Sequence, residues 1–197
     1  MIRSKADYIK FKETDMLING QSSRTFQSVL KDIMFPEPTI VFLKYLRKYE
    51  YYYNAKSWSG KIVGLYYYAK YCKWSLKTGI SIPRHVFNEG LCIPHYGSIV
   101  VNPTAKVGRN CMIHVGVNIG TNGGSAVSPI IGNNVYIGPG AKIFGEITIA
   151  DNCYIGANAV VNSSFIEPFS VIVGAPAKAV KTETKVWWQK NRKKMKL

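Results

Sequence analysis

Residues 131–161 read IGNNVYIGPGAKIFGEITIADNCYIGANAVV. A branched aliphatic side chain recurs at every sixth position, namely Ile131, Ile137, Ile143, Ile149, Ile155 and Val161. The register continues backwards, once the segment 120–130 is set aside, through Ile119, Ile113, Val107 and Val101. This period matches neither an α-helix nor an alternating β-hairpin. Self-similarity at a fixed period is typical of a β-solenoid.

The hexads predict how the solenoid is built. Each supplies one short strand and one turn with the aliphatic side chain inward, so that stacked coils bury a continuous column of Ile and Val. The turns are expected at 108–110, 132–134 and 150–152, which contain Gly, Asn and Asp. These residue types tolerate the backbone angles of tight corners.

The register is irregular in two places. Upstream of Val101 the inward positions hold Pro83, Glu89 and His95 instead of aliphatic residues. Between Ile119 and Ile131 the spacing doubles, and we expect a loop that leaves the coil. Loops on a rigid scaffold are where functional sites usually lie.

Three regions follow from the pattern. Residues 1–78 are expected to form an N-terminal arm and α-helical cap, 79–180 the solenoid, and 181–197 a basic tail or short C-terminal helix. The net charge is +15, yet residues 79–180 carry five basic and four acidic side chains, so the excess lies at the two ends. Within the first region, the polar residues 1–22 predict a loosely held arm, followed by a short helix over about 24–34.

Two longer helices are predicted from about residue 36 to 56 and from about 59 to 77. One apolar face of the second helix is expected to cover the solenoid, and consists of Ile62, Leu65, Tyr66, Ala69, Cys72 and Leu76. Clustered Tyr and Lys also suit anionic sugars, lipid phosphates or nucleic acid. Neither helix has a nucleic-acid-binding motif. We therefore favour a helix pair that caps the solenoid and contacts neighbouring chains, with no nucleic-acid partner.

The basic tail holds Trp187 and Trp188. It fits a membrane-surface or polyphosphate-binding helix, or equally a helix whose tryptophans pack on the solenoid. The chain shows no membrane-spanning run and no signal-peptide pattern. We expect a cytoplasmic protein whose basic ends allow peripheral contact with the inner membrane surface. Its four cysteines lack metal-type spacing and are expected to be free, buried thiols.

Several segments together resemble one known family. They are GLCIPHYGSIVV at 90–101, VGRNC at 107–111, GVNIG at 116–120, IGPGAKI at 137–143 and GAPAK at 174–178. The pattern is similar to the hexapeptide-repeat acyltransferases, in the serine acetyltransferase branch and more closely to O-acetyltransferases of surface-polysaccharide clusters. The resemblance implies a mainly β fold, a left-handed parallel β-helix with three hexads per coil. It also implies a homotrimer, acetyl-CoA as acyl donor and no metal.

The resemblance also assigns roles to residues. The histidine before the Gly-x-Ile-Val segment is the family's general base, here His95, although spacing alone favours a core histidine. Because His114 follows the inward Ile113, it is expected to face outward. It is expected either to orient the acceptor or, equally, to be a solvent or interface residue. The implied donor-binding positions are Thr121, Gly138, Pro139, Ala157 and Lys178. Gly138 fits a plain solenoid corner as well as it fits a cofactor groove.

The acceptor is predicted from departures from the family pattern. Serine acetyltransferases carry Asp-Ile-His-Pro where this chain has 80–83 (ISIP), and Arg-His-Pro where it has 127–129 (VSP). We therefore expect serine to be a poor acceptor. The prediction is an O-acetyltransferase acting on a small-molecule or lipid-linked sugar in capsule, exopolysaccharide or O-antigen synthesis. The alternatives are a serine O-acetyltransferase of cysteine biosynthesis and a non-catalytic trimeric scaffold.

Overall fold

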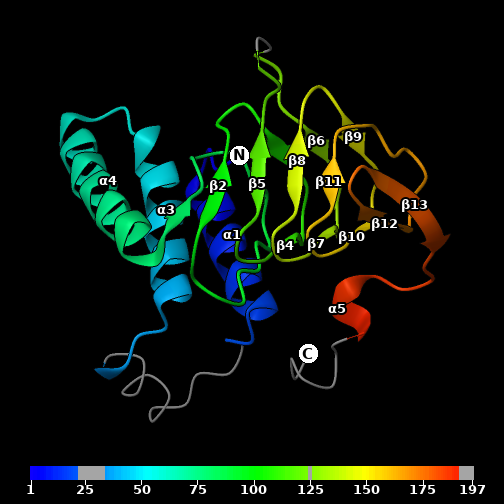
Figure 1. Cartoon of the computed structure of the whole chain (residues 1–197). Coiled ribbons are helices and arrows are strands. Elements are labelled where there is room, and N and C mark those ends of the chain that lie inside the picture. The colour runs from blue at the N-terminus through cyan, green and yellow to red at the C-terminus, as the bar shows by residue number, and fades with distance from the viewer. Residues whose placement is uncertain (22–33, 124–125, 191–197) are drawn as a thin grey trace.

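The computed structural model describes residues 1–21, 34–123 and 126–190 of the 197-residue chain. The helix predicted over 24–34 lies outside the described residues, apart from Met34. Figure 1 shows helices at one end of a stack of short strands, with a hairpin and a one-turn helix at the other. The described helices are α1 (Lys5–Ile18), α3 (Pro38–Tyr53), α4 (Trp58–Thr78) and α5 (Trp187–Lys190). None of them is long and apolar enough to cross a membrane.

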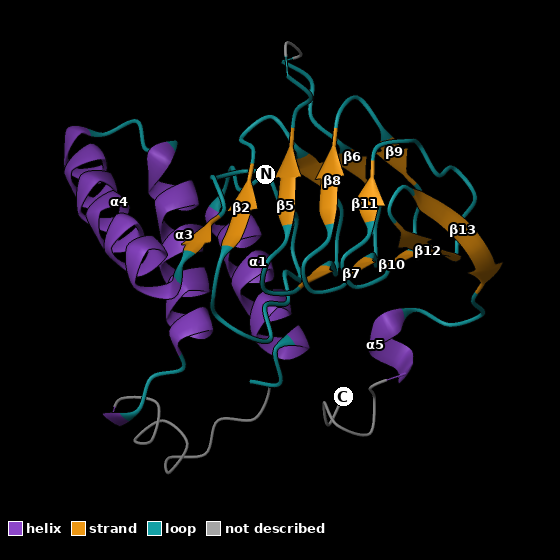
Figure 2. Ribbon diagram, in the orientation of Figure 1, coloured by secondary structure: helices purple, strands orange, loops and turns teal. Residues whose placement is uncertain are grey.

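The strands form three sheets that we call the A, B and C faces (Figure 2). The A face contains β1 (Ile80–Ser81), β2 (Ile99–Val101), β5 (Asn118–Gly120), β8 (Lys142–Phe144) and β11 (Val160–Val161). The B face contains β3 (Lys106–Val107), β6 (Ile130–Ile131) and β9 (Thr148–Ile149). The C face contains β4 (Met112–Ile113), β7 (Tyr136–Ile137), β10 (Tyr154–Ile155), β12 (Ser170–Gly174) and β13 (Ala177–Thr182). All pairs are parallel except β12–β13, so the predicted parallel β-helix is confirmed.

The hexad positions form the core as predicted. All ten aliphatic residues of the register point inward, and none is more than 3% exposed. The predicted corner at 108–110 stacks on those at 132–134 and 150–152 through an asparagine ladder. The Asn110 amide donates to Asn134 Oδ1 at 3.0 Å, and the Asn134 amide donates to Asn152 Oδ1 at 2.8 Å. All three have positive φ, a conformation that Asn adopts more readily than most residues.

The loop that was predicted to leave the coil lies between β5 and β6. Nine residues join these strands, whereas three join β8 to β9 at the same corner one coil later. Because β5 is on the A face and β6 on the B face, this loop is an insertion at a corner, and the coil resumes in register beyond it.

The register prediction is wrong in the first coil. Phe87 pairs with Val107, and Cys92 pairs with Met112, which aligns Ile93 with Ile113. The inward positions are therefore Ile82, Phe87 and Ile93, not Pro83, Glu89 and His95. The corner between Ile93 and Val101 is two residues longer than a hexad, and this places His95 outside the core.

The expectation of a loose N-terminal arm is also wrong. Residues 5–18 form α1, which begins at a capping box between Ser4 and Asp7. Phe11 and Asp15 are buried on its inner side. Sequence alone did not show this because the partners of α1 lie tens of residues away.

Helices α3 and α4 confirm the two long helices, but α4 is turned the opposite way from the prediction. Its aromatic side packs inward: Tyr67 stacks on Tyr52 at 5.2 Å and Tyr71 on Tyr49 at 5.4 Å between ring centroids. Gly64 lets the helices approach, since a Cβ there would lie 3.2 Å from the Tyr52 carbonyl oxygen. The predicted aliphatic face consequently points to solvent, where Leu65 is 68% exposed.

The described part of the C-terminal tail, up to residue 190, packs on the solenoid through α5. Trp187 in α5 is 1% exposed, and its indole N–H donates to the Asn110 carbonyl at 2.8 Å. It forms a small second core with Ile18, Cys92 and Met112. Of the two alternatives for the tail, the helix with packed tryptophans is confirmed for α5, Trp187–Lys190.

Candidate active site

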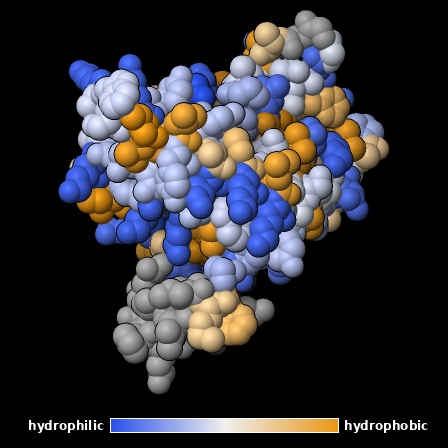
Figure 3. All heavy atoms as spheres, turned by 90° about the vertical axis from the view of Figure 1, so that its left-hand side faces the viewer, coloured by the Kyte–Doolittle hydropathy of each residue, from blue (hydrophilic) through white to orange (hydrophobic). Residues whose placement is uncertain are grey.

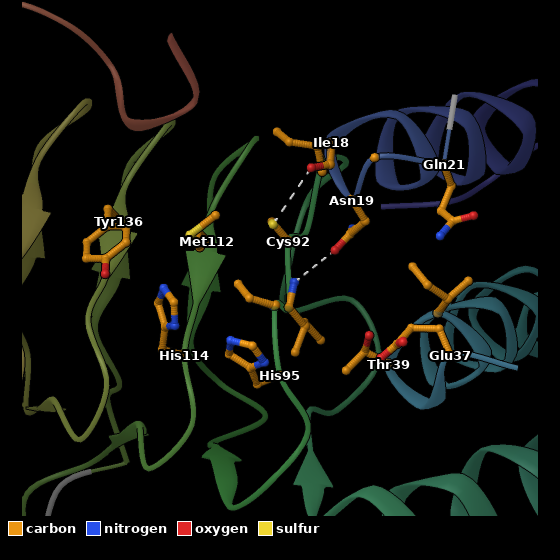
Figure 4. Close-up of a pocket in the computed structure, with 14 residues that line it drawn as sticks. Ile18, Asn19, Gln21, Glu37, Thr39, Cys92, His95, Met112, His114 and Tyr136 are labelled. Atoms are coloured by element: carbon orange, nitrogen blue, oxygen red, sulfur yellow. Dashed lines mark hydrogen bonds between the residues drawn. The ribbon is translucent and has the colours of Figure 1, made fainter. Parts of the chain in front are cut away.

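One pocket of about 660 Å³ lies where the helical region meets the C face of the solenoid. Its walls come from the end of α1, the start of α3 and the first coils of the solenoid (Figure 4). The polar side chains that line it are Asn19, Gln21, Glu37, Thr39, His95, His114 and Tyr136. The pocket therefore gathers two of the three histidines of the chain from separate coils.

His95 lies in this pocket because of the elongated corner that follows Ile93. The corner displaces its imidazole from the apolar interior to the exposed side of the wall. Among the described residues, no side chain hydrogen-bonds its ring. A solvent-accessible imidazole at a pocket wall can exchange protons with a bound molecule, which a histidine packed in a core cannot.

His114 lies beside His95, one coil further along the solenoid (Figure 4). Its ring packs at 5.2 Å from the Tyr136 ring. Burial, and then the charge of His95, lowers the pKa of His114, so the neutral imidazole is favoured. Its Nε2 is buried without a hydrogen-bond partner among the described residues. This placement outside the core agrees with the predicted outward orientation of His114.

The backbone leading to His95 is held by the end of α1. Asn19 accepts a hydrogen bond from the Ile93 amide at 3.2 Å and donates to the Leu91 carbonyl at 2.9 Å (Figure 4 shows the first). These two bonds make α1 part of the support for the corner that carries His95. In the sequence, only the polar side chain of Asn19 could have indicated this supporting role. Asn is too common in loops for that to identify it.

A buried ion network fixes the chain further upstream. Arg47 donates to Asp15 at 2.8 Å and to Glu50 at 2.8 Å, and none of the three is more than 2% exposed. Asp15 also accepts the amides of Gly90 and Leu91. Burial opposes the charge of Arg47, but Asp15 and Glu50 raise its pKa, so the guanidinium stays charged. The network joins α1 and α3 to the segment that precedes His95.

Cys92 also lines the pocket but is a poor nucleophile. Burial raises its pKa to about 12, so it remains a neutral thiol near neutral pH. All four cysteines are free, and only Cys72 is not fully buried. In the described part of the chain, no group of three His, Cys, Asp or Glu residues is placed to hold a metal ion.

The predicted donor-binding residues fall in three places. Pro139 and Ala157 lie on the corner between the C and A faces, the same edge that carries His95 and His114. Gly138 is required by coil stacking, since a Cβ would lie 2.8 Å from the Ala157 amide nitrogen. Thus Gly138 fits the structural interpretation without any ligand.

The other two predicted donor-binding residues, Thr121 and Lys178, lie away from the edge that carries His95. Thr121 follows β5 at the corner between the A and B faces, one face away from His95. Lys178 is exposed on β13, five strand spacings or roughly 24 Å from the strand of Cys92. A single chain therefore does not bring all the predicted donor residues together.

Comparison with known proteins identifies the repeat. Residues 128–163 match the family described as bacterial transferase hexapeptide (six repeats). The match starts at the end of the 121–129 loop and covers the most regular coils.

Curated relatives are serine acetyltransferases. The chain is 39% identical over 106 residues to one from Mycobacterium tuberculosis and 40% identical over 109 residues to one from Staphylococcus xylosus. The alignments cover 52% and 54% of this chain and 46% and 50% of those proteins. The chain thus spans about half the length of the curated relatives it matches.

Solved serine acetyltransferases share the fold. The enzyme of Neisseria gonorrhoeae superimposes with a TM-score of 0.69 at 25% identity, covering 92% of this chain and 67% of that one. The Brucella abortus enzyme in complex with coenzyme A gives 0.72 at 22% identity, covering 91% and 70%. Together with the repeat match, this confirms the left-handed parallel β-helix.

The comparisons overturn the predicted acceptor. Relatives at 36–40% identity are serine acetyltransferases, so the interpretation as a surface-polysaccharide O-acetyltransferase is wrong. That interpretation relied on two missing motifs at 80–83 and 127–129. Missing residues show which contacts are absent, but they do not show which acceptor replaces serine, or whether other elements supply the contacts.

Proposed function

We propose that this protein is an acetyl-CoA-dependent serine O-acetyltransferase with His95 as general base. The observation that carries the proposal is the exposed imidazole of His95 in the pocket between helices and solenoid. The relatives at up to 40% identity support the acyl donor and the acceptor.

In the proposed reaction His95 removes the proton from the serine hydroxyl as its oxygen attacks the thioester carbonyl carbon. The tetrahedral intermediate collapses, the carbon–sulfur bond breaks, and the imidazolium returns the proton to the departing CoA thiolate. The products are O-acetylserine and CoA, and no acyl-enzyme forms. Proton transfer by a positioned base contributes roughly 100-fold to 10,000-fold.

His114 is proposed to hold the acceptor. Its lowered pKa keeps it neutral, so it does not add a second positive charge beside His95 when His95 takes the proton. Its unpartnered Nε2 is available for one hydrogen bond to the acceptor after a small adjustment of the ring.

The start of α3 is proposed to supply the contacts missing from the family motifs. Glu37 and Thr39 face His95 across the pocket (Figure 4). The Glu37 carboxylate makes no capping hydrogen bond to its own helix, which leaves it available for the serine ammonium group. The amides of Thr39 and Ile40 lie in the first turn, where helix N–H groups lack acceptors and attract a carboxylate.

The donor is proposed to lie along the edge that carries His95, Pro139 and Ala157. A homotrimer would place a different corner of a neighbouring copy beside this edge, because each solenoid is a triangular prism. Such packing would allow Thr121 and Lys178 to contact CoA although they are distant from His95 within one chain.

The test is CoA release followed with a thiol reagent, using acetyl-CoA and L-serine with wild type and His95→Asn. We expect serine-dependent release in the wild type and a loss of at least about 100-fold in the variant. D-serine and free sugars serve as acceptor controls. Release that is independent of serine, or unchanged by His95→Asn, would overturn the proposal.

A further inference from the structure

The outward side of α4 carries an unpartnered apolar stripe. We define the α4 outer face as this stripe together with the lysines beside it. The stripe consists of Trp58, Ile62, Leu65, Tyr66 and Leu76, which are 78%, 50%, 68%, 54% and 87% exposed. Ala69 is also exposed within it. No described element covers this face, because α4 packs against α3 through its opposite, aromatic side.

Lysines flank the stripe. They are Lys61, Lys70, Lys73 and Lys77, and α4 contains no Asp or Glu. Lys70 lies over the Tyr66 ring at 5.3 Å. Figure 3 views the molecule from the side of α4 and shows apolar patches interleaved with hydrophilic atoms. The face therefore combines apolar and purely cationic chemistry along a helix of 21 residues, about 31 Å.

This combination fits the surface of an anionic bilayer. A helix in the plane of the headgroups buries Trp, Leu and Ile at the acyl boundary while its lysines meet lipid phosphates. Each lysine near such a surface strengthens binding by about five-fold. The helix is too polar to cross the bilayer, so an in-plane position is the one that its composition allows.

A second copy of the chain fits the same face less well. A symmetric contact would bring the lysines of two α4 helices together, and neither helix offers an acidic residue to pair with them. Like charges held in contact are unfavourable. Charge complementarity therefore favours an anionic partner over self-association.

We propose that the α4 outer face docks the protein on an anionic membrane surface, with α4 lying in the plane of the headgroups. This surface lies outside the His95 pocket and does not depend on the proposed reaction. Docking would hold the pocket near the membrane while leaving the solenoid in solution.

The experiment is flotation of the full chain with phosphatidylcholine vesicles, with or without about one third phosphatidylglycerol. We expect binding only to the anionic vesicles. Leu65→Ser with Leu76→Ser should abolish it, and Lys61→Glu with Lys73→Glu should weaken it by more than about 25-fold. Ile130→Ser with Ile166→Ser is the matched control, since both residues are exposed aliphatics on the solenoid. Circular dichroism checks that each variant is folded.

Two results would overturn the proposal. One is equal flotation of the wild type and the α4 variants, which would assign vesicle binding to another surface. The other is no flotation of the wild type, with light scattering showing that only the α4 leucine variant has a smaller assembly mass. That second result would assign the α4 outer face to contact between copies.

Discussion

Removal of the Asp15 carboxylate tests how the helical region supports the corner that carries His95. In the wild type this carboxylate accepts Arg47 Nε at 2.8 Å, and the amides of Gly90 and Leu91 at 2.8 and 2.9 Å. Asp15→Ala deletes all of these acceptors at a site that is fully buried. The Arg47 guanidinium then stays charged with Glu50 as its remaining carboxylate partner.

The expected loss follows from these contacts. Breaking a buried ion pair by removing one partner costs about 3–5 kcal/mol. Each buried amide left without an acceptor adds about 1 kcal/mol or more, part of which relaxation recovers. We expect the free energy of unfolding to fall by about 4 kcal/mol. With a urea m-value of about 2 kcal/mol/M, the midpoint moves down by about 2 M.

The measurement is urea unfolding followed by tryptophan fluorescence and by circular dichroism. Glu13→Gln on the exposed side of α1 is the control, and should change stability by less than about 0.5 kcal/mol. A loss below about 1 kcal/mol in Asp15→Ala would refute the reasoning, because it would mean that the network contributes no more than a surface ion pair.

Three further outcomes are expected. Glu37→Gln should raise the KM for serine by about ten-fold, equivalent to 1.4 kcal/mol, and leave the KM for acetyl-CoA unchanged; equal effects on both substrates would exclude a contact with the serine ammonium group. Stability should decline as pH falls below about 6.5, because the unfolded chain protonates His114 before the folded chain does. Because burial also lowers the pKa of His85, His114→Gln should reduce that decline in pH-dependent urea titrations without removing it, and an unchanged slope would contradict the prediction. Trp187→Ala should cost about 3–5 kcal/mol in the same unfolding assay, because it empties a fully buried site; a negligible loss would show that α5 is not docked.

Two errors of the sequence interpretation have separate physical causes. The first coil was read in the wrong register because two extra residues at 94–100 are visible only when Ile93 is aligned with Ile113 across coils. The predicted orientation of α4 was the reverse of the observed one, because both sides of this helix are apolar enough to be buried. Its aromatic side packs against the tyrosines of α3, and hydrophobic periodicity alone does not rank aromatic against aliphatic burial.

The residues of the candidate site also divide into those that the sequence indicated and those that it did not. His95 was found through a local motif, and His114 through its place after an inward aliphatic residue. Asn19, Glu37 and Thr39 were missed because they lie in the helical region, more than 50 residues before His95. Their residue types are ordinary at helix ends, so no local signal marked them as part of a pocket.

The sequence by itself determined the parallel β-helix, its inward residues from Val101 to Val161 and its asparagine corners, since these depend on contacts that repeat every coil. Only the tertiary structure decided which side of α4 is buried, that α1 is anchored through Asp15 to Arg47, and that Trp187 packs behind the pocket. The physical reason is the range of the interactions. In a repeated coil the same contacts recur at a short, regular spacing in the sequence. A pocket between helices and solenoid instead depends on single pairs of residues far apart in the chain.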